Sequence, residues 1–435
     1  MENIMNFVKY LLSLVVAVGF TGSVLADSAD NANRFDEELN ERDWRVLRDF
    51  INSKRTIDVQ EKSVSLAISG DVRTEWRHIT EKQDGINLRS DDHKATVDEV
   101  TYPIRGPNEF DIELNLYFDY VCDRAWAVAH LNFDNDAGVS DNGLDCKVDP
   151  EGYHGSGYCD GICLKKAYMG YNLFCDECGR FDIELGRRGN LYNAFDSEIQ
   201  FLSRLDGILF TYSSNWECVA DWYAKAAGFV VDERVNHFAW VIELGFLNIC
   251  DSGLDFKYSF IDWEKNGINR CLVHDPEGFK FLNSQFTLAY HFDPEALCVP
   301  AKAFGAFLIN HAAERHEWTR DKRANIGWYV GFTLGEVIYA GDWAATVQYQ
   351  VVQAQAIPDD DVSGIGRGNV LGSSVTTDPG HNGNTNYKGW RFEGLYALTD
   401  NLTIDTIIEW SHADDARIGD SHSYSKLEVE AVYAF

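Results

Sequence analysis

The segment "LEVEAVYAF" (Leu427–Phe435) ends the chain and alternates strictly in polarity. A period of two places alternate side chains on opposite faces of a β-strand. One face carries Glu428 and Glu430, and the other carries the apolar residues Leu427, Val429, Ala431, Tyr433 and Phe435. Chain ends usually fray, because nothing beyond them holds their backbone groups. A final strand with one apolar face therefore predicts that a neighbouring strand holds this end.

The same alternation starts at Val64 and recurs to the end of the chain, for example in "VSLAISGDVRTEWR" (64–77) and "FDIELNLYFDY" (110–120). Together with weaker segments, it predicts about sixteen strands. The expected strands are 64–77, 110–120, 125–134, 162–174, 180–186, 204–212, 219–231, 239–246, 254–260, 284–292, 301–311, 326–335, 343–351, 390–398, 402–410 and 427–435. The connections between them alternate between long polar stretches and short turns, and only the link near 232–237 breaks this alternation.

The chemistry of the two strand faces distinguishes a membrane barrel from a soluble β-sandwich. A sandwich turns its polar faces to bulk water and packs bulky aliphatic side chains in its core. Here the apolar face is rich in aromatic rings, several near strand ends, as in the aromatic girdles of transmembrane barrels. The rings are Trp76, Phe118, Tyr120, Trp222, Trp240, Tyr258, Trp343, Tyr349, Trp410 and Tyr433. The polar face is then expected to enclose water, with Asp71, Glu75, Asp111, Glu113, Glu184, Asp405 and Glu409 facing the lumen.

These observations predict an all-β fold, an antiparallel transmembrane β-barrel over residues 63–435. Each strand has room for the roughly 9 to 11 residues that a tilted span needs. Closure is required, because an unpaired strand edge in hydrocarbon leaves backbone groups unsatisfied. The last strand must therefore pair with the first, and we expect Leu427, Val429, Tyr433 and Phe435 to belong to the strand that closes the ring.

The N-terminal residues differ from the rest of the chain. Residues 1–26 combine Lys9, the apolar run "LLSLVVAVGF" and small residues up to Ala26, which predicts a secretory signal peptide rather than a membrane anchor. In 27–62, apolar residues recur at near-helical spacing among charges, which favours a periplasmic amphipathic helix. Such a helix could form a short coiled coil, plug the lumen or tether the barrel.

Overall composition narrows the function classes. The net charge is −31, which argues against nucleic acid as a partner, because nucleic acid requires clustered Lys and Arg. No uninterrupted apolar stretch after Ala26 is long enough to span a bilayer as a helix. The ten cysteines fit an oxidising compartment, in agreement with export.

The terminal "LEVEAVYAF" is similar to the closing strand of bacterial outer-membrane proteins, and the span from Val64 to Phe435 resembles the porins. "LGRRGNLYNAFDSEIQFLSRLDGILFTY" (185–212) is similar to a pair of hairpin strands found in that family. The resemblance implies a sixteen-stranded homotrimer in the outer membrane of a Gram-negative type of cell. Both termini would be periplasmic, and the channel would pass small hydrophilic solutes and ions.

The resemblance also implies a constriction, because in such porins the third external loop folds into the lumen with acidic residues opposite a basic wall. Here that loop is 189–203, which offers Asp196 and Glu198. Candidate opposing cations are Arg73, Arg77, Arg187, Arg188 and Arg204. The family's Pro-Glu-Phe-Gly-Gly motif is absent from this loop, so an ordinary solvated loop is the alternative. The acidic excess of the chain favours weak cation selectivity.

The cysteines form a second pattern. A zinc site is disfavoured, since the spanning strand 164–174 would separate Cys159 and Cys163 from Cys175 and Cys178 by about 35 Å at roughly 3.3 Å per residue. A redox role for "CDEC" lacks its βαβ setting. Six cysteines fall at the short periplasmic turns: Cys122, Cys175, Cys178, Cys218, Cys250 and Cys298. This ring is similar to the cysteine-rich major outer-membrane proteins of chlamydial-type bacteria, which implies disulfides between proteins. Disulfides within the chain and free thiols remain alternatives.

The sequence as a whole predicts a passive porin with no catalytic residues, metal or cofactor. Scattered Ser and His residues around "HNGN" (381–384) form no nucleophile or metal motif. The first alternative is a structural outer-membrane protein or adhesin with a closed lumen and disulfide partners in the envelope. The second is a soluble, secreted β-sandwich or lectin.

Overall fold

The computed structural model describes residues 59–61, 64–90, 94–97, 100–103, 106–136, 162–176, 179–216, 219–233, 236–263, 280–293, 299–315, 317–358, 361–366, 385–418 and 421–435. The predicted signal peptide and most of the predicted N-terminal helix lie outside these residues. The final part of that predicted helix is a short strand instead, β1 (Val59–Glu61). No helix among the described residues combines the length and the apolar character needed to cross a bilayer.

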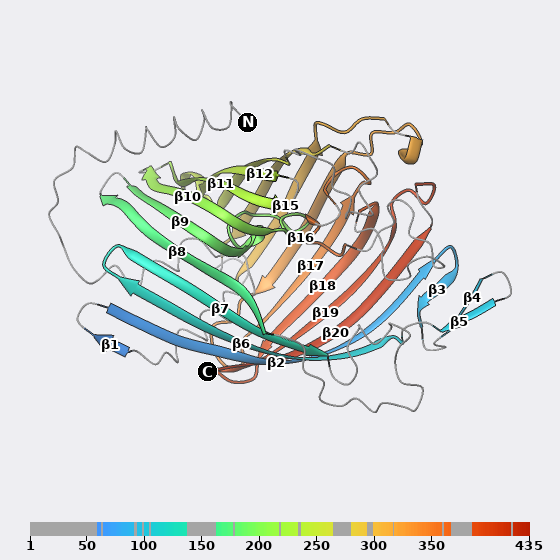
Figure 1. Ribbon diagram of the computed structural model, residues 1–435, viewed down its shortest axis with the longest axis horizontal. Helices are drawn as coiled ribbons and strands as arrows, with labels where there is room; N and C mark the ends of the chain where they lie inside the picture. The colour runs from blue at the N-terminus through green and yellow to red at the C-terminus, as the bar shows by residue number, and fades with distance from the viewer. Residues whose placement is uncertain are drawn as a thin grey trace. The chain divides into compact units, whose positions relative to one another are not determined.

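Sixteen strands form one closed antiparallel barrel, in which each strand pairs with its neighbours along the ring (Figure 1). Its strands are β2 (Val64–Gln83), β6 (Asn108–Cys122), β7 (Ala125–Asp136), β8 (Ile162–Asp176), β9 (Gly179–Asn190), β10 (Arg204–Trp216), β11 (Ala220–Asp232), β12 (His237–Leu247), β13 (Leu254–Asp262), β14 (Leu282–Phe292), β15 (Ala301–Asn310), β16 (Ile326–Gly335), β17 (Trp343–Val352), β18 (Tyr387–Ala397), β19 (Leu402–Ala413) and β20 (His422–Ala434). The predicted fold class and strand number are confirmed.

The ring closes between its first and last strands. β2 pairs with β20 from Asp71 opposite Ala434 to Gln83 opposite His422, and Figure 1 shows the blue strand beside the red one. One more pair of bonds extends this ladder, because Phe435 N donates to Gly70 O at 2.9 Å and Gly70 N donates to Phe435 O at 3.0 Å. Both backbone groups of the last residue are therefore satisfied within the seam.

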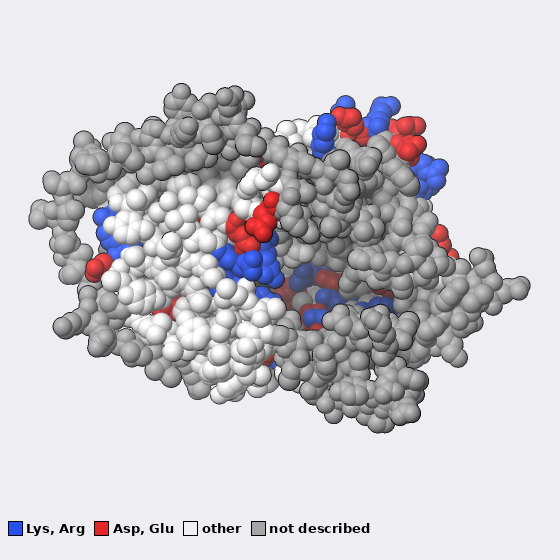
Figure 2. Space-filling model, in the orientation of Figure 1, with Lys and Arg blue, Asp and Glu red and all other residues white. Residues whose placement is uncertain are grey.

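The side chains of each barrel strand alternate between an exposed outward face and a buried inner face. On β12, Trp240 is 37% exposed and Ile242 is 41% exposed, whereas Val241 is 0% and Glu243 is 1% exposed. Rings of neighbouring strands contact one another on the outward face, with centroids 4.9 Å apart for Tyr349 and Trp390 and 5.1 Å apart for Phe392 and Trp410. The barrel thus carries aromatic side chains on its outer surface. Figure 2 shows a broad white area in which Lys, Arg, Asp and Glu are sparse.

Because the strands alternate in direction, the long connections share one end of the barrel, together with the short link between β11 and β12. The other end carries the short turns. The connection between predicted strands 64–77 and 110–120 is shorter than expected, since β2 continues to Gln83 and shorter strands follow. These additional strands are β3 (Ile86–Arg89), which pairs with β2, and the separate hairpin of β4 (Lys94–Val97) and β5 (Val100–Pro103). Other described connections contain the short 3-10 helices η3 (Leu191–Asn193), η5 (Ile249–Asp251) and η6 (Glu317–Thr319).

Substitution of Gly70 tests the closed seam. A Cβ at this position would lie 2.7 Å from the backbone oxygen of Asn115 and 2.7 Å from the Phe435 ring. We expect Gly70→Ala to destabilise the barrel by about 1–3 kcal/mol, the usual cost of overpacking. The measurement is the temperature at which the protein loses its folded mobility in SDS gels. Gly228→Ala is the control, since its Cβ would meet open space. Equal unfolding temperatures for the two variants would contradict this account of the seam.

Candidate functional site

The inner face of the barrel at the seam carries a ladder of ion pairs. Arg77 on β2 contacts Asp111 on β6 at 2.7 Å and Glu428 on β20 at 3.3 Å. Arg73 lies two inner-face positions closer to the start of β2, 3.8 Å from Glu430. These pairs join β6, β2 and β20 on the lumen side, where the backbone ladder closes the ring.

A second group of charges continues this ladder onto β18 and β19. Lys426 on β20 lies 2.9 Å from Glu428 and 3.2 Å from Glu409 on β19. Glu409 in turn lies 3.7 Å from the Arg391 guanidinium on β18. Charged side chains therefore line a continuous part of the inner wall, from β6 across the seam to β18.

Carboxylates outnumber cations on this charged wall. The acidic side chains on the inner face of β2, β6 and β18–β20 include Asp71, Glu75, Glu109, Asp111, Glu113, Glu393, Asp405, Glu409, Glu428 and Glu430, and the basic ones are Arg73, Arg77, Arg391 and Lys426. Several remain partly accessible: the side chains of Arg77, Arg391 and Glu113 are 32%, 24% and 23% exposed. Figure 2 shows side chains of both charges close together within a hollow. These side chains of the charged wall are therefore partly accessible to solvent.

The seven side chains expected to face the lumen all lie on the inner face of the barrel. Asp71 accepts a hydrogen bond from Asn115 at 2.9 Å and pairs with Arg73. Glu184, on β9, lies 2.7 Å from Arg188. The other five belong to the charged wall of β2, β6 and β19: Glu75, Asp111, Glu113, Asp405 and Glu409.

Opposite the charged wall, the connection between β9 and β10 (191–203) folds against the inside of the barrel. Lys225 on β11 donates to Ala194 O at 2.6 Å, and the Asp196 carboxylate lies 3.4 Å from Lys257 on β13. Further along, Gln348 on β17 donates to Glu198 at 3.4 Å. The loop thus crosses the inner face from β11 to β17.

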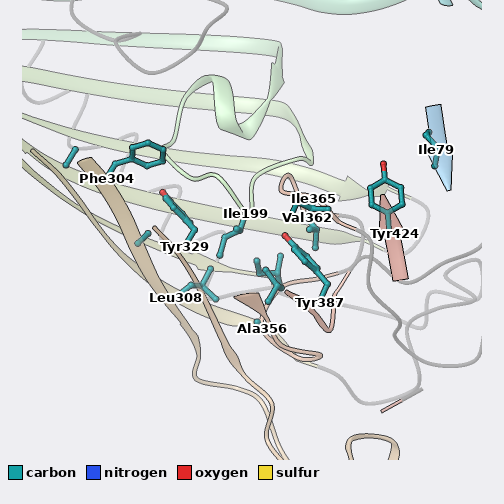
Figure 3. Close-up of a cluster of buried hydrophobic side chains, with 14 residues drawn as sticks. Ile79, Ile199, Phe304, Leu308, Tyr329, Ala356, Val362, Ile365, Tyr387 and Tyr424 are labelled. Carbon is teal, nitrogen blue, oxygen red and sulfur yellow. The ribbon is translucent and has the colours of Figure 1, made fainter. Parts of the chain in front are cut away.

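Apolar packing holds this inward loop in place. Phe195 and Phe201 are 2% and 0% exposed and belong to a buried cluster with Val241 of β12 and Ile261 of β13. Ile199, also 0% exposed, enters a second cluster, in which it lies between Leu308 of the wall and the loop after β17 (Figure 3). Most other members of the second cluster belong to β14–β17 or to the loop after β17: Ala289, Phe304, Ala306, Tyr329, Val352, Ala356, Ile357, Val362 and Ile365. Tyr387 of β18, Tyr424 of β20 and Ile79 of β2 extend the cluster to the edge of the charged wall. The inner wall from β11 to β17 is therefore covered by packed side chains.

The structure separates the residues expected to form the constriction. Arg73 and Arg77 bind carboxylates of the charged wall, and Arg188 binds Glu184 on its own strand. Arg187 lies on the outward face, where it donates to Asp206 at 2.8 Å and 2.6 Å. Arg204 is exposed at the start of β10. None of these contacts joins an arginine to Asp196 or Glu198.

The cations that face the inward loop are ones that sequence reasoning did not single out. Lys257 lies beside Asp196, and Arg391 interacts electrostatically with Glu198. Both occupy polar positions in alternating segments, "LDFKYSF" and "WRFEGLYAL", so the period placed them on the inner face. No feature of the sequence indicates which of many inner-face cations lies opposite the loop.

Four cysteines lie in the described part of the chain, and all four are free thiols: Cys122, Cys163, Cys175 and Cys250. Cys163 and Cys175 lie at opposite ends of β8. Cys122, Cys175 and Cys250 share the end of the barrel with the short turns, whereas Cys178, Cys218 and Cys298 lie outside the described residues. No group of His, Cys, Asp and Glu among the described residues is arranged to hold a metal ion.

Comparisons with known proteins find similarity only at the level of structure, since no family model and no curated protein matches the chain. Salmonella typhi OmpF in complex with daunomycin aligns over 87% of this chain and 100% of its own, with 12% identity and a TM-score of 0.46. Pseudomonas putida OprB at high pH aligns over 85% of this chain and 94% of its own, with 10% identity and a TM-score of 0.49. A Rhodopseudomonas blastica porin mutant aligns over 85% of this chain and 100% of its own, with 10% identity and a TM-score of 0.40. At such low scores, the function has to be argued from the barrel's own residues.

Asp415 connects three of the long loops above the barrel. Its carboxylate lies 2.6 Å from Lys322, in the β15–β16 loop, and 2.9 Å from Arg417. Its backbone oxygen accepts a hydrogen bond from Asn386, beside β18, at 3.1 Å. Hydrogen bonds from Arg417 and Lys322 hold the pKa of the Asp415 carboxyl well below its usual range.

Because the folded-state pKa of Asp415 is lowered, its ionised form stabilises the loops above the ordinary Asp pKa of about 3.9. This contribution is lost as the pH falls through the folded-state pKa. We expect Asp415→Asn to lower stability at pH 7 by roughly 0.2–1 kcal/mol, because both cationic partners are solvent-exposed. Thermal unfolding in detergent at pH 7 and at lower pH measures the stability lost in the variant. Arg417→Gln should also lower the stability at pH 7. A deficit that stayed constant down to strongly acidic pH would exclude the ionised carboxyl as its cause.

Proposed function

We propose that the protein is an outer-membrane porin, a water-filled channel for passive diffusion of small hydrophilic solutes and ions. One observation carries the proposal: the same strands expose aromatic side chains outward and place partly accessible charged side chains inward. Trp76 of β2 is 37% exposed, whereas its neighbour Arg77 joins the ion pairs of the inner wall. An apolar exterior around a charged interior is stable when lipid surrounds the barrel and water fills it.

The location follows from the same chemistry. Closed barrels with apolar exteriors belong to outer membranes of the Gram-negative type, where the short turns are periplasmic and the long loops external. By this assignment the C-terminus, Cys122, Cys175 and Cys250 are periplasmic, as the N-terminus would be. Assembly as a homotrimer is implied by the family resemblance and stays a prediction.

The inner wall also bears on ion preference. Its carboxylates exceed its cations, and several of the charged side chains remain accessible to water. Rings of Asp and Glu in a lumen favour cations over anions, and nearby arginines and lysines weaken that preference. We therefore propose a weakly cation-selective channel, with Asp196 and Glu198 on the loop that narrows it.

Reconstitution in a planar bilayer tests the channel directly. We expect stepwise, ohmic conductance from detergent-purified protein, and a reversal potential in a KCl gradient that indicates modest cation preference. Glu113→Gln should reduce this preference, because the Glu113 side chain is 23% exposed in the lumen. Asp400→Asn, in the short β18–β19 turn, removes an equal charge outside the lumen and should leave it unchanged.

Each contrary result has a distinct meaning. Folded protein that inserts without conducting would support the closed structural protein or adhesin instead. Anion selectivity would remove the proposed ion preference but keep the channel. Protein that stays soluble and monodisperse without detergent would exclude a lipid-facing exterior.

The thiols at the short-turn end support a second part of the proposal, disulfides to other envelope proteins. Cys175 and Cys250 are exposed and free, and the periplasm is oxidising. We expect non-reducing gels of isolated envelopes to contain species larger than the protein alone, which disappear on reduction. Cys175→Ser should weaken these species, whereas Cys163→Ser, at the other end of β8, should not. Detection of monomer alone, or of a non-covalent oligomer alone, would contradict cross-linking.

A further inference from the structure

The loop after β17 also folds into the barrel, where it contacts the loop 191–203 directly. Ser363 N donates to Ile199 O at 3.1 Å, and Leu202 N donates to Asp361 O at 3.1 Å. The Ser363 hydroxyl donates to Gln200 O at 2.6 Å. Val362 and Ile365 of the same loop belong to the apolar cluster around Ile199 (Figure 3). The two loops therefore form one unit inside the lumen.

Asp361 is the residue through which the two loops are joined most directly. Its side chain is 0% exposed. Its Oδ2 accepts a hydrogen bond from Phe201 N at 3.1 Å, and its Oδ1 accepts one from Ser203 N at 3.0 Å. Hydrogen bonds to an ionised acceptor are stronger than neutral ones, and the exclusion of water strengthens them further.

The backbone of Phe201 shows why these bonds matter. Its φ is +81°, in the left-handed region that bulky residues rarely adopt. Such a conformation persists only when its surroundings hold it. One Asp361 oxygen binds the amide of Phe201 itself, and the other binds the amide two residues later. The carboxylate thus holds the chain in the conformation that turns Ile199 and Phe201 into their two apolar clusters.

We propose that Asp361 is the positioning residue of the constriction. By holding residues 199–203 against the wall of β11–β17, it limits the open lumen to the side that carries the charged side chains of β18–β20, β2 and β6. The apolar clusters supply non-directional attraction, whereas the two hydrogen bonds fix the register between the loops. This inference rests on the channel proposed above and adds a residue that determines its width.

Residues 194–196, in the first half of the loop 191–203, have contacts of their own with the barrel wall. Loss of the Asp361 carboxylate should therefore not detach them. Lys225 binds Ala194 O, and Lys257 lies beside Asp196, so residues 194–196 stay attached to β11 and β13. Removal of the Asp361 charge should therefore release residues 199–203 without unfolding the barrel. The released segment would move within the lumen and change its open area from moment to moment.

The test compares Asp361→Asn with Asp342→Asn in single-channel recordings. Asp342 is a matched control because its carboxylate also accepts two backbone N–H bonds, from Ile338 at 3.0 Å and Tyr339 at 2.7 Å, but in the short β16–β17 turn. We expect transitions between conductance levels to become about tenfold more frequent in Asp361→Asn, from the loss of charge-assisted hydrogen bonds. Asp342→Asn should retain the steady current of the wild type.

The possible outcomes separate this inference from the proposed function. If the wild type conducts and a folded Asp361→Asn variant gives the same quiet current as Asp342→Asn, the positioning role is wrong while the channel stands. If the wild type does not conduct at all, the channel itself is wrong. Should Asp361→Asn fail to fold, Ser363→Ala removes one loop-to-loop hydrogen bond without a charge change. It should give a smaller increase in transitions, and an unchanged current there would equally contradict the proposal.

Discussion

Closure of the backbone hydrogen-bond ladder between β2 and β20 is the constraint on which the rest of the structure depends. In hydrocarbon, each unpaired N–H or C=O costs several kcal/mol, so a sheet with apolar outward side chains is stable only as a complete ring. The pairing runs from Asp71 to Gln83 on β2, and the Gly70–Phe435 bonds extend it to the last residue of the chain. The ion pairs of Arg73 and Arg77 with β20 reinforce the same seam from the lumen side.

Closure also creates the two environments on which function depends. Because side chains alternate along every strand, one ring of backbone bonds separates an aromatic exterior from a charged interior. How the interior is divided depends on which loops pack inside it and not on the number of strands. Loop residues 191–203, 353–358 and 361–366 cover the side of β11–β17, where Ile199 of the first loop and Leu308 of the wall strand β15 are both 0% exposed. In the channel proposed above, water occupies the charged side from β18 across the seam to β6, and the two loops set its width.

The charged wall explains why Arg73 and Arg77 pair with neighbouring strands. On β2, Arg73 and Arg77 have carboxylates on both neighbouring strands, and these near partners satisfy them before any loop can. Arg187 and Arg188 are adjacent in sequence, so the period of a strand places them on opposite faces, and only Arg188 lies inside. The loop carboxylates instead approach Lys257 and Arg391, which belong to the strands that the loop crosses.

The sequence by itself determined the all-β class, the sixteen barrel strands and which face of each strand is polar, because a period of two is a local property that survives in every strand. It also indicated that the last strand must be paired, since an aromatic end with one apolar face requires a partner. Only the tertiary structure decided that two loops fold inward, that Asp361 joins them, and that Lys257 and Arg391 face the narrowing loop. These facts depend on contacts between residues far apart in the chain, such as Phe201 and Asp361, which are 160 positions apart. No local pattern records which distant wall a loop will pack against.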